Sequence, residues 1–422
     1  MAWRTVNIGA DKDLMTVVGQ FLSGVGANVG RVLRTLAVEN YRSLRDLVLP
    51  LSALTLVTGP NGSGKSSLYR ALRLLADASR NGAVSALARE GGLPSTLWAG
   101  PETVGRAVRE GRSRVQGTVR TKPVGLRLGF SGDEFGYALD LGLPVPGRTV
   151  FNLDPEFKRE CVWRGPVLRP ASLLADRGGP AVRTRDQSGA WGEKPDRIRL
   201  TDSMLSEFGD PRRCPELLIV RERIRSWRFY DHFRTDTGAP ARRTGIGTRT
   251  PILGHDGADV AAALQTIIEI GNAEALATSI DDAFPGSRLE VADAGEGRLE
   301  LRFFQHGLLR PLGPAELSDG TLRYLLWVAA LLSPRPPELL VLNEPETSLH
   351  PDLLPALAAL IATAAKETQL VVVTHAQPLV RAIEAAAEGL DVARLELAKE
   401  FGATVLNGQK RLDRPAWHWP KR

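Results

Sequence analysis

The sequence predicts an α/β fold with a parallel core sheet, an antiparallel side sheet and an inserted arm. Three observations support this class. The apolar strand Leu54–Thr58 runs into a glycine-rich loop and then into a helix. Residues 117–143 alternate apolar and polar side chains with a period of two, which is typical of antiparallel strands. Residues 318–374 alternate helices with short β-branched runs, which is typical of a parallel sheet.

The composition is that of a folded protein with one large domain or two ordinary ones. The chain has 422 residues, of which 43% are hydrophobic, and no apolar run is long enough to span a bilayer. Its two cysteines, Cys161 and Cys214, lack partners at metal-binding spacing. This argues against a zinc site and a secreted disulfide scaffold, and it favours a reducing cytoplasm. The net charge of +6 permits binding to a polyanion without demonstrating it.

Residues 1–31 show no clean hydrophobic period and lack the features of a secretory signal. The regular pattern begins at Val32, so we expect one domain over 32–422. Two explanations of the first residues stay open. They are an extension upstream of a natural start near Val32, or an arm that packs on a partner. Mass spectrometry of the native N-terminus distinguishes the two.

The glycine-rich loop fits the phosphate-binding pattern G-x-x-x-x-G-K-[ST]. Glycines allow backbone N–H groups to turn toward phosphate oxygens, and the N-terminus of the following helix adds partial positive charge. Lys65 is expected on the β- and γ-phosphates of a nucleotide and Ser66 on Mg²⁺. The alternative, a glycine-rich surface turn, is disfavoured because the flanking strand and helix both suit the pattern. The predicted loop residues are Gly59, Pro60, Asn61, Gly62, Ser63, Gly64, Lys65, Ser66 and Ser67.

Around this loop, two strands over 32–39 and 44–49 are expected, joined by the turn Asn40-Tyr41-Arg42-Ser43. The helix after the loop is expected over 66–75, and a short second helix over 84–89. Two further strands, 124–128 and 136–141, are expected to form the side sheet.

Residues 150–252 are rich in Arg, Gly, Pro and Asp, so we expect an inserted arm of short elements. Part of this segment mixes basic and aromatic residues, which could hold phosphates and stack bases. The alternative is a solvated helix face with a small hydrophobic anchor, which we favour slightly because charge runs are weak evidence. The residues are Arg221, Arg223, Arg225, Arg228, Arg234, Arg242, Arg243, Trp227, Phe229, Tyr230 and Phe233.

Helices over 259–271 and 273–284 and a hairpin around Gly295-Glu296-Gly297 are expected next. The chain then returns to the core, where we expect a helix near Ser318, strands over 339–342 and 370–374 and a helix over 353–365. Neither a heptad run nor an internal repeat is present, which excludes a long coiled coil within this chain.

The strand over 339–342 ends in Asn343 and Glu344. An acid in this position can orient or deprotonate the water that attacks a γ-phosphate, so Glu344 is the candidate catalytic residue. Phosphate-loop ATPases usually carry Asp before it. Asn343 can bind a magnesium-bound water but supplies no charge, so we expect weaker Mg²⁺ binding or slower turnover.

Two further segments are candidates for phosphate contacts. Ser318 and Gly320 at a helix start could bind an anion, although an ordinary helix cap is the alternative. His375 follows the strand over 370–374, where contact with the γ-phosphate is favoured over a structural role. The loop Ser348-Leu349-His350-Pro351 follows the Glu344 segment.

This ordered set of motifs resembles the head of ATP-binding-cassette (ABC) type ATPases, which are P-loop NTPases. The turn containing Arg42 resembles the start of the RecF/SMC/OLD branch, whose members act on DNA. The chain is similar to bacterial RecF-like ATPases of the AAA family. This likeness covers nearly the whole chain from Val32.

The resemblance implies that Lys65 and Ser66 hold ATP and Mg²⁺, that Glu344 activates water and that His375 senses the γ-phosphate. It places Arg42 among the cofactor-binding residues and Asn343 with Ser66 at the metal. It also implies a homodimer in which Ser318 and Gly320 reach the ATP of the second subunit, while Ser348 and His350 lie at that interface. Gln116 is a weak candidate for the family's glutamine loop.

Two functions stay open from the sequence. The first is an ATP-hydrolysing enzyme whose dimerisation is coupled to work on DNA in repair or defence. The second is a slow or non-hydrolysing switch that recruits a protein partner such as a nuclease. A self-contained nuclease is disfavoured, because the sequence after His375 shows no second acidic metal site.

Overall fold

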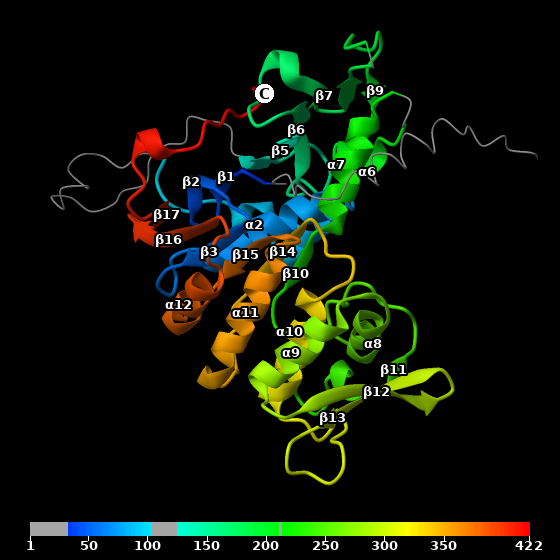
Figure 1. Ribbon diagram of the computed structural model, residues 1–422. Coiled ribbons are helices and arrows are strands. Elements are labelled where there is room, and N and C mark those ends of the chain that lie inside the picture. The colour runs from blue at the N-terminus through cyan, green and yellow to red at the C-terminus, as the bar shows by residue number, and fades with distance from the viewer. Residues whose placement is uncertain (1–32, 103–124, 187, 211–212) are drawn as a thin grey trace, which may run out of the picture. The chain divides into compact units, whose positions relative to one another are not determined.

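The computed structural model describes residues 33–102, 125–186, 188–210 and 213–422 (Figure 1). These residues belong to one compact unit, Arg31–Arg422. The expectations for residues 1–31, Val124 and Gln116 lie outside the described residues.

The core is a six-stranded sheet with the order β10-β14-β15-β3-β16-β17 (Figure 1). Its first five strands are parallel and β17 is antiparallel to β16, so the predicted parallel core is confirmed. The strands are β10 (Arg228–Tyr230), β14 (Leu339–Asn343), β15 (Gln369–Val373), β3 (Leu54–Thr58), β16 (Val392–Glu400) and β17 (Ala403–Leu406).

Alternate residues of the core strands enter two different hydrophobic clusters. Val341 and Val371 pack with helix α2 (Lys65–Ala78) and with the side sheet. Leu340 and Leu370 pack on the opposite face with the helices of the C-terminal half. Both faces of the sheet are therefore covered, as expected for strands that are apolar at nearly every position. The other helices near this sheet are α3 (Ala83–Arg89), α4 (Leu93–Thr96), α10 (Asp319–Leu331), α11 (Leu354–Ala364) and α12 (Gln377–Ala386).

The second sheet is antiparallel and has the order β2-β1-β4-β5-β6-β7-β8-β9, which confirms the predicted side sheet and extends it. The first four strands are close to those expected. Its strands are β1 (Thr35–Tyr41), β2 (Leu44–Pro50), β4 (Gly125–Ser131), β5 (Phe135–Gly142), β6 (Glu156–Arg164), β7 (Leu173–Gly178), β8 (Ala181–Thr184) and β9 (Asp196–Arg197).

The segment 150–252, expected as one inserted arm, is divided among several parts of the fold. Strands β6 to β9 complete the side sheet, and α6 (Met204–Glu207) and α7 (Pro215–Ser226) follow. Strand β10 then becomes the edge of the core sheet. The expectation missed these strands because their polar residues make buried pairs. Glu160 of β6 and Arg177 of β7 form a salt bridge in which both side chains are 0% exposed.

A third, three-stranded sheet has the order β11-β13-β12. It contains the predicted hairpin, whose turn residues Gly295, Glu296 and Gly297 all have positive φ. The strands are β11 (Gly245–Ile246), β12 (Arg288–Gly295) and β13 (Arg298–Phe304), and the nearby helices are α8 (Val260–Ile270) and α9 (Ala273–Ala283). None of the helices in the described ranges has the length and apolar character needed to cross a bilayer.

Candidate functional site

The predicted phosphate loop connects β3 to α2 and depends on its glycines. Gly59, Gly62 and Gly64 have φ values of 143°, 77° and 112°, a range that glycine adopts easily. A Cβ at Gly59 would overlap the Leu397 carbonyl oxygen, and one at Gly64 would overlap the side chain of Thr404. Glycine at these two positions therefore lets the C-terminal hairpin β16–β17 pack directly against the loop.

Lys65, the first residue of α2, lies under the loop. Its ammonium group donates hydrogen bonds to the carbonyl oxygens of Gly59 (2.7 Å) and Pro60 (3.1 Å). Burial lowers the pKa of Lys65, while the charges of Glu344 and Glu346 raise it. The electrostatic coupling shows that the loop lies near the carboxylates that follow β14.

Two hydroxyl groups are buried in the phosphate loop and at the end of the strand before it. Thr58 ends β3 and Ser63 lies within the loop, and both side chains are about 1% exposed. Neither hydroxyl oxygen has a hydrogen-bond partner among the described residues. Unpaired buried hydroxyls are costly in a folded protein, so the loop is a place where a polar ligand would complete the hydrogen bonding.

Glu344 and His375 come together at the carboxyl ends of β14 and β15. The His375 Nδ1 atom lies 3.4 Å from Glu344 Oε1 and 3.5 Å from Glu346 Oε1. Glu344 adopts φ 49°, an uncommon conformation for a residue with a side chain, and its N–H donates to the Val373 carbonyl (2.7 Å). Strain of this kind concentrates at functional positions.

Glu346 is a member of this cluster that the sequence analysis missed. Its side chain is nearly buried and accepts hydrogen bonds from the Thr374 hydroxyl (2.6 Å) and the His375 N–H (3.3 Å). These bonds link the segment after β14 to the segment after β15. A second acid two residues after Glu344 was the only signal in the sequence.

Asn343 binds a residue that the sequence analysis also missed. Its Nδ2 atom donates to Asp231 Oδ1 at 2.6 Å. Asp231 directly follows β10, which pairs with β14 in parallel. An acid after the apolar residues Phe229 and Tyr230 was a signal for a strand end, but these residues lay in the segment interpreted as an arm.

Ser66, Asn343 and Asp231 line one cavity of about 430 Å³ beside α2. Glu90 lines the same cavity and forms a salt bridge with Arg42 (2.6 Å), so Arg42 lies close to this cavity through its partner. The other lining residues are Tyr69, Arg70, Arg73, Leu74, Asp77, Ala86 and Arg89. The cavity therefore brings together the two residues predicted to hold a metal.

In the parts of the chain that the structure describes, no group of three or more His, Cys, Asp or Glu residues could hold a metal ion. Mg²⁺ does not need such a cage, because it is commonly bound through one or two protein groups, water and substrate phosphates. The hydroxyl of Ser66 and the amide of Asn343, beside one carboxylate, fit this mode of binding.

Ser318 and Gly320 lie at the start of α10. The Ser318 hydroxyl accepts a hydrogen bond from the Thr321 N–H (3.1 Å), as a helix cap does. A Cβ at Gly320 would lie 3.5 Å from the Ser348 carbonyl, so the loop containing Ser348 and His350 adjoins this cap. Both of these loop residues are exposed, and Ser348 has φ 61°.

Arg242 holds this segment in place by donating to the Leu317 carbonyl (2.8 Å) and to Asp319 Oδ1 (2.7 Å). No described hydrogen bond or ion pair joins the segment 317–321 to the loop 59–67 within one chain. The structure brings Lys65, Ser66, Asn343, Glu344 and His375 to one edge of the core sheet, whereas Ser318 and Gly320 lie next to the loop of Ser348.

The aromatic residues of the mixed basic segment are structural. Trp227, Phe229, Tyr230 and Phe233 are between 0% and 5% exposed. Trp227 packs on Phe130, and both Tyr230 and Phe233 pack on Trp327. The alternative favoured from the sequence, a hydrophobic anchor, is confirmed, because buried rings are not available for stacking on bases.

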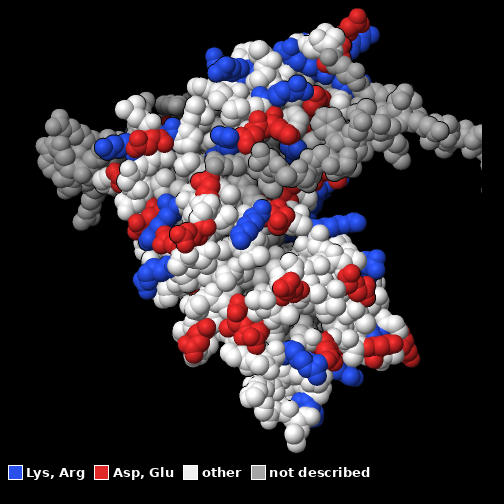
Figure 2. Space-filling view, in the orientation of Figure 1, with Lys and Arg blue, Asp and Glu red and all other residues white. Residues whose placement is uncertain are grey.

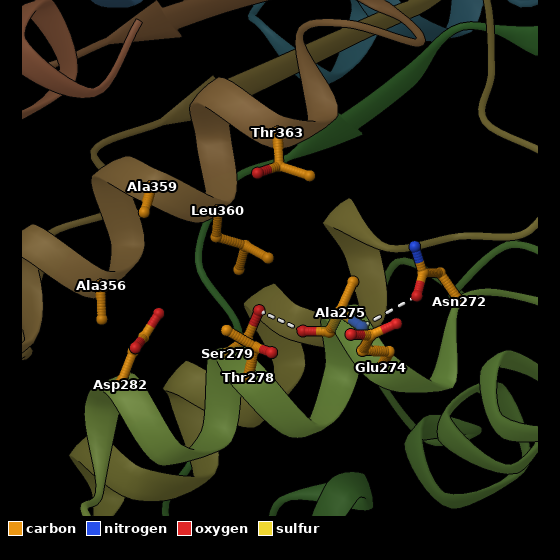
Figure 3. Close-up of a pocket in the computed structure, with 10 residues that line it drawn as sticks. All are labelled: Asn272, Glu274, Ala275, Thr278, Ser279, Asp282, Ala356, Ala359, Leu360 and Thr363. Carbon is orange, nitrogen blue, oxygen red and sulfur yellow. Dashed lines mark hydrogen bonds between the residues drawn. The ribbon is translucent and has the colours of Figure 1, made fainter.

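A second cavity, of about 290 Å³, lies between α9 and α11. Figure 3 shows Asp282 of α9 near Ala356 of α11 at one end of this cavity, and Glu274 beside Asn272 at the other end. None of the predicted site residues lines it, so it is separate from the phosphate loop.

Known proteins resemble this chain over different parts of its length. A family model described as "AAA domain, putative AbiEii toxin, Type IV TA system" matches residues 54–381. An OLD nuclease of Thermus scotoductus is 48% identical over 44 residues, which are 10% of this chain and 8% of the relative. The match thus spans a small part of that relative's length.

Solved structures of SMC heads are also similar. An SMC head bound to the C-terminal winged-helix domain of ScpA aligns with a TM-score of 0.45 and 14% identity, over 89% of this chain and 97% of the other. The SMC head domain from Thermotoga maritima aligns with a TM-score of 0.40 and 15% identity, over 90% of this chain and 99% of the other.

Proposed function

The chain belongs to the AAA-domain family whose model matches residues 54–381, and from this premise we propose that it binds ATP with Mg²⁺ and hydrolyses it. The resemblance to RecF/SMC/OLD-like ABC-type ATPases is confirmed by that match and by the OLD relative. The observation that carries the proposal is the contact between Glu344 and His375 at 3.4 Å, beside the loop of Lys65.

Each residue of this edge has a distinct task in the proposal. The loop N–H groups and Lys65 bind the β- and γ-phosphates, and Ser66 and Asn343 hold the metal. Mg²⁺ neutralises charge on the phosphate oxygens when bound. Glu344 accepts a proton from the attacking water, and His375 contacts the γ-phosphate. Glu346 positions His375 through the bond to its N–H.

The surface formed by Ser318, Ser348 and His350 supports a second part of the proposal. Ser318, Ser348 and His350 are exposed and adjacent, and Arg242 holds the cap in a defined conformation. We propose that a two-fold dimer places this surface of one chain against the ATP on Lys65 of the other. The partial positive charge of the helix N-terminus at Ser318 suits the γ-phosphate of the partner's nucleotide.

Phosphate release tests the enzymatic proposal. Wild type, Lys65→Ala and Glu344→Gln are compared with and without Mg²⁺. We expect Mg²⁺-dependent release by wild type and a loss of about 10²-fold or more in Glu344→Gln, because general-base catalysis contributes about 10² to 10⁴ in rate. Equal rates in all three proteins would contradict hydrolysis at this site.

A second candidate function is a switch that binds ATP and turns it over slowly or not at all. Asn343 favours it, because an amide stands where ATPases of this type usually carry a carboxylate. The bound state would then recruit a protein partner. A single-turnover measurement separates the two functions: nucleotide that stays intact for hours on a dimer supports the switch.

We also propose that the ATP cycle is coupled to DNA, on the basis of the OLD relative and the net charge of +6. Figure 2 shows Lys and Arg interspersed with Asp and Glu on the face drawn, so this face presents no continuous basic stripe. If arginines bind the phosphates of DNA, affinity falls steeply between low and high salt. A flat salt dependence would contradict this part of the proposal.

A further inference from the structure

The contact between Asn343 and Asp231 determines how the Asn343 amide is oriented. An ionised carboxylate only accepts hydrogen bonds, so the group that faces Asp231 Oδ1 at 2.6 Å is the NH₂ of the amide. The amide oxygen consequently points away from Asp231. It accepts no hydrogen bond from any residue that the structure describes, so it is available as an acceptor for a ligand.

The fold places this pair on the same side of the core sheet as Ser66. Tyr230 is paired with Leu342 in register, so Asp231 and Asn343 are the next residues on adjacent parallel strands. Tyr230 and Leu342 belong to the cluster on the face opposite α2. Because side chains alternate along strands, Asp231 and Asn343 lie on the α2 face, where Ser66 lines the same cavity.

A second, independent feature of this cavity indicates a ligand. Tyr69 of α2 lines it, and the Tyr69 side chain is only 3% exposed. Within the described ranges its hydroxyl makes no hydrogen bond of ordinary geometry. Burial, followed by the nearby charge of Asp231, raises the pKa of Tyr69, although the Arg73 guanidinium, which lines the same cavity, lies close enough to lower it. The hydroxyl therefore stays protonated and able to donate.

We propose that Asp231 is a positioning residue for Mg²⁺: it supplies the negative charge that Asn343 lacks and turns the Asn343 oxygen toward the water shell of the metal. The inference rests on the proposed binding of ATP with Mg²⁺. The charge usually carried by the strand of Asn343 is provided here from the neighbouring strand β10.

A purely structural role for Asp231 has a different signature. Arg70 and Arg73 line the same cavity, and Asp231 could simply balance their charge. Removing a structural charge would change the stability of the fold and would weaken nucleotide binding equally with and without Mg²⁺. A role toward the metal changes only the Mg²⁺ dependence.

The contact between Asp231 and Asn343 also predicts what happens when the usual aspartate is restored at position 343. Asn343→Asp alone places two carboxylates in contact, where like charges raise one pKa and disfavour ionisation of both. The exchange variant Asp231→Asn/Asn343→Asp keeps one amide and one carboxylate and reverses the hydrogen bond. It retains the total charge of the pair while moving it to the usual position.

The test titrates Mg²⁺ at a fixed concentration of a fluorescent, non-hydrolysable ATP analogue and measures the half-saturating Mg²⁺ concentration. Asp231→Asn is expected to raise the half-saturating Mg²⁺ concentration about tenfold, which is in the range for residues that support metal ligands. The affinity for the nucleotide analogue without Mg²⁺ should stay unchanged. The exchange variant should return to within about twofold of wild type. Asp236→Asn, which removes an exposed acid paired with Arg234 nearby in the chain, is the matched control and should match wild type.

Three results would overturn the inference, and they are distinguishable. If Asp231→Asn shows the Mg²⁺ dependence of wild type and every variant binds nucleotide normally, only the proposed role of Asp231 is overturned. An equal loss with and without Mg²⁺ in Asp231→Asn assigns it a structural role instead. Wild-type protein that binds no nucleotide in the presence of Mg²⁺ overturns the proposed function as well.

Discussion

One buried charge cluster in the side sheet and the polar residues at the edge of the core sheet differ in whether their hydrogen bonding is complete. In the side sheet, Glu160 and Arg177 are 0% exposed and 2.6 Å apart. Glu160 also accepts from the hydroxyls of Tyr137 (2.7 Å) and Ser203 (2.6 Å) and from the Met204 N–H (2.8 Å). Both charges of this one pair therefore have hydrogen-bond partners within the described residues, since Arg177 also donates to the carbonyl oxygens of Gly179 (2.8 Å) and Arg199 (2.8 Å).

At the edge of the core sheet the groups are exposed or incomplete. The side chains of Glu344 and His375 are 40% and 50% exposed, and the buried hydroxyls of Thr58 and Ser63 have no partner among the described residues. The difference teaches that a completed charge cluster holds the fold together, whereas an incomplete one at strand ends is prepared for a ligand. The following predictions test this division.

The largest expected effect is on stability, in the side sheet. Arg177→Met leaves Glu160 as a buried charge without its cation, which should cost about 3–5 kcal/mol in the free energy of unfolding. Denaturant unfolding measures it, with ATP affinity of the folded protein unchanged. Arg414→Met breaks the exposed pair with Asp46 and serves as the control, with a cost of at most about 1 kcal/mol. Equal costs for the two variants would contradict a structural role for the buried pair.

The next effect is on binding, at the core edge. Lys65→Met removes charged hydrogen bonds to phosphate, worth about 1.5–3 kcal/mol, and should weaken ATP binding by about 10- to 150-fold. The free energy of unfolding should not fall, because a partly buried charge is replaced by an apolar chain of similar length. Calorimetric titration and denaturant unfolding of the same samples test both. Wild-type ATP affinity in this variant would show that the loop of Lys65 does not bind the phosphates of ATP.

A smaller effect is expected where the C-terminal hairpin supports the loop. The Thr404 hydroxyl donates to the Ser63 carbonyl at 2.7 Å. Thr404→Val keeps the shape and removes this bond, together with the hydrogen bonds of the same hydroxyl to Ser43 (2.8 Å) and Lys399 (3.3 Å). The loss should cost at least about 1 kcal/mol and weaken ATP binding about fivefold. Thr266→Val removes a buried hydroxyl of α8 that also donates to a backbone carbonyl at 2.7 Å, that of Ala262, and should leave ATP affinity unchanged. Equal ATP affinities for the two variants would show that the hairpin does not position the loop.

The smallest effect concerns pH. Burial lowers the pKa of Lys65 in the folded state. Between that pKa and the ordinary one, the unfolded chain binds the proton and the folded chain does not, so the free energy of unfolding should rise as pH rises through this window. ATP affinity should fall over the same window as the charge is lost. Lys65→Met should remove both trends, and a wild-type pH profile in that variant would assign them to other groups.

The contiguous parts of the site were predictable from sequence because each forms within a few residues. The strand β3, the glycine loop and helix α2 follow one another, and the β14 segment carries Glu344 at its end. Apolar runs ended by polar residues are enough to indicate strand ends in a parallel sheet. The burial of the aromatic anchor around Trp227 was likewise favoured from sequence.

The parts that depend on distant partners were not predictable. Strand β10 has three residues and gains its place by pairing with β14, more than a hundred positions later in the chain. Strand β16 joins β3 in the same way. Asp231 and Glu346 gain their importance from neighbours on other strands, and polar pairs such as Glu160–Arg177 conceal the strands of the side sheet behind a charged composition.

The central claim is that one ATP is bound by Lys65 of one chain and by Ser318 of its partner, and mixing two inactive variants tests it most directly. Lys65→Ala and Ser318→Arg chains are purified separately, mixed and assayed for Mg²⁺-dependent phosphate release. A mixed dimer contains one intact composite site, so the account predicts that the mixture regains activity that neither variant has alone. A mixture no more active than the average of its two components would contradict it.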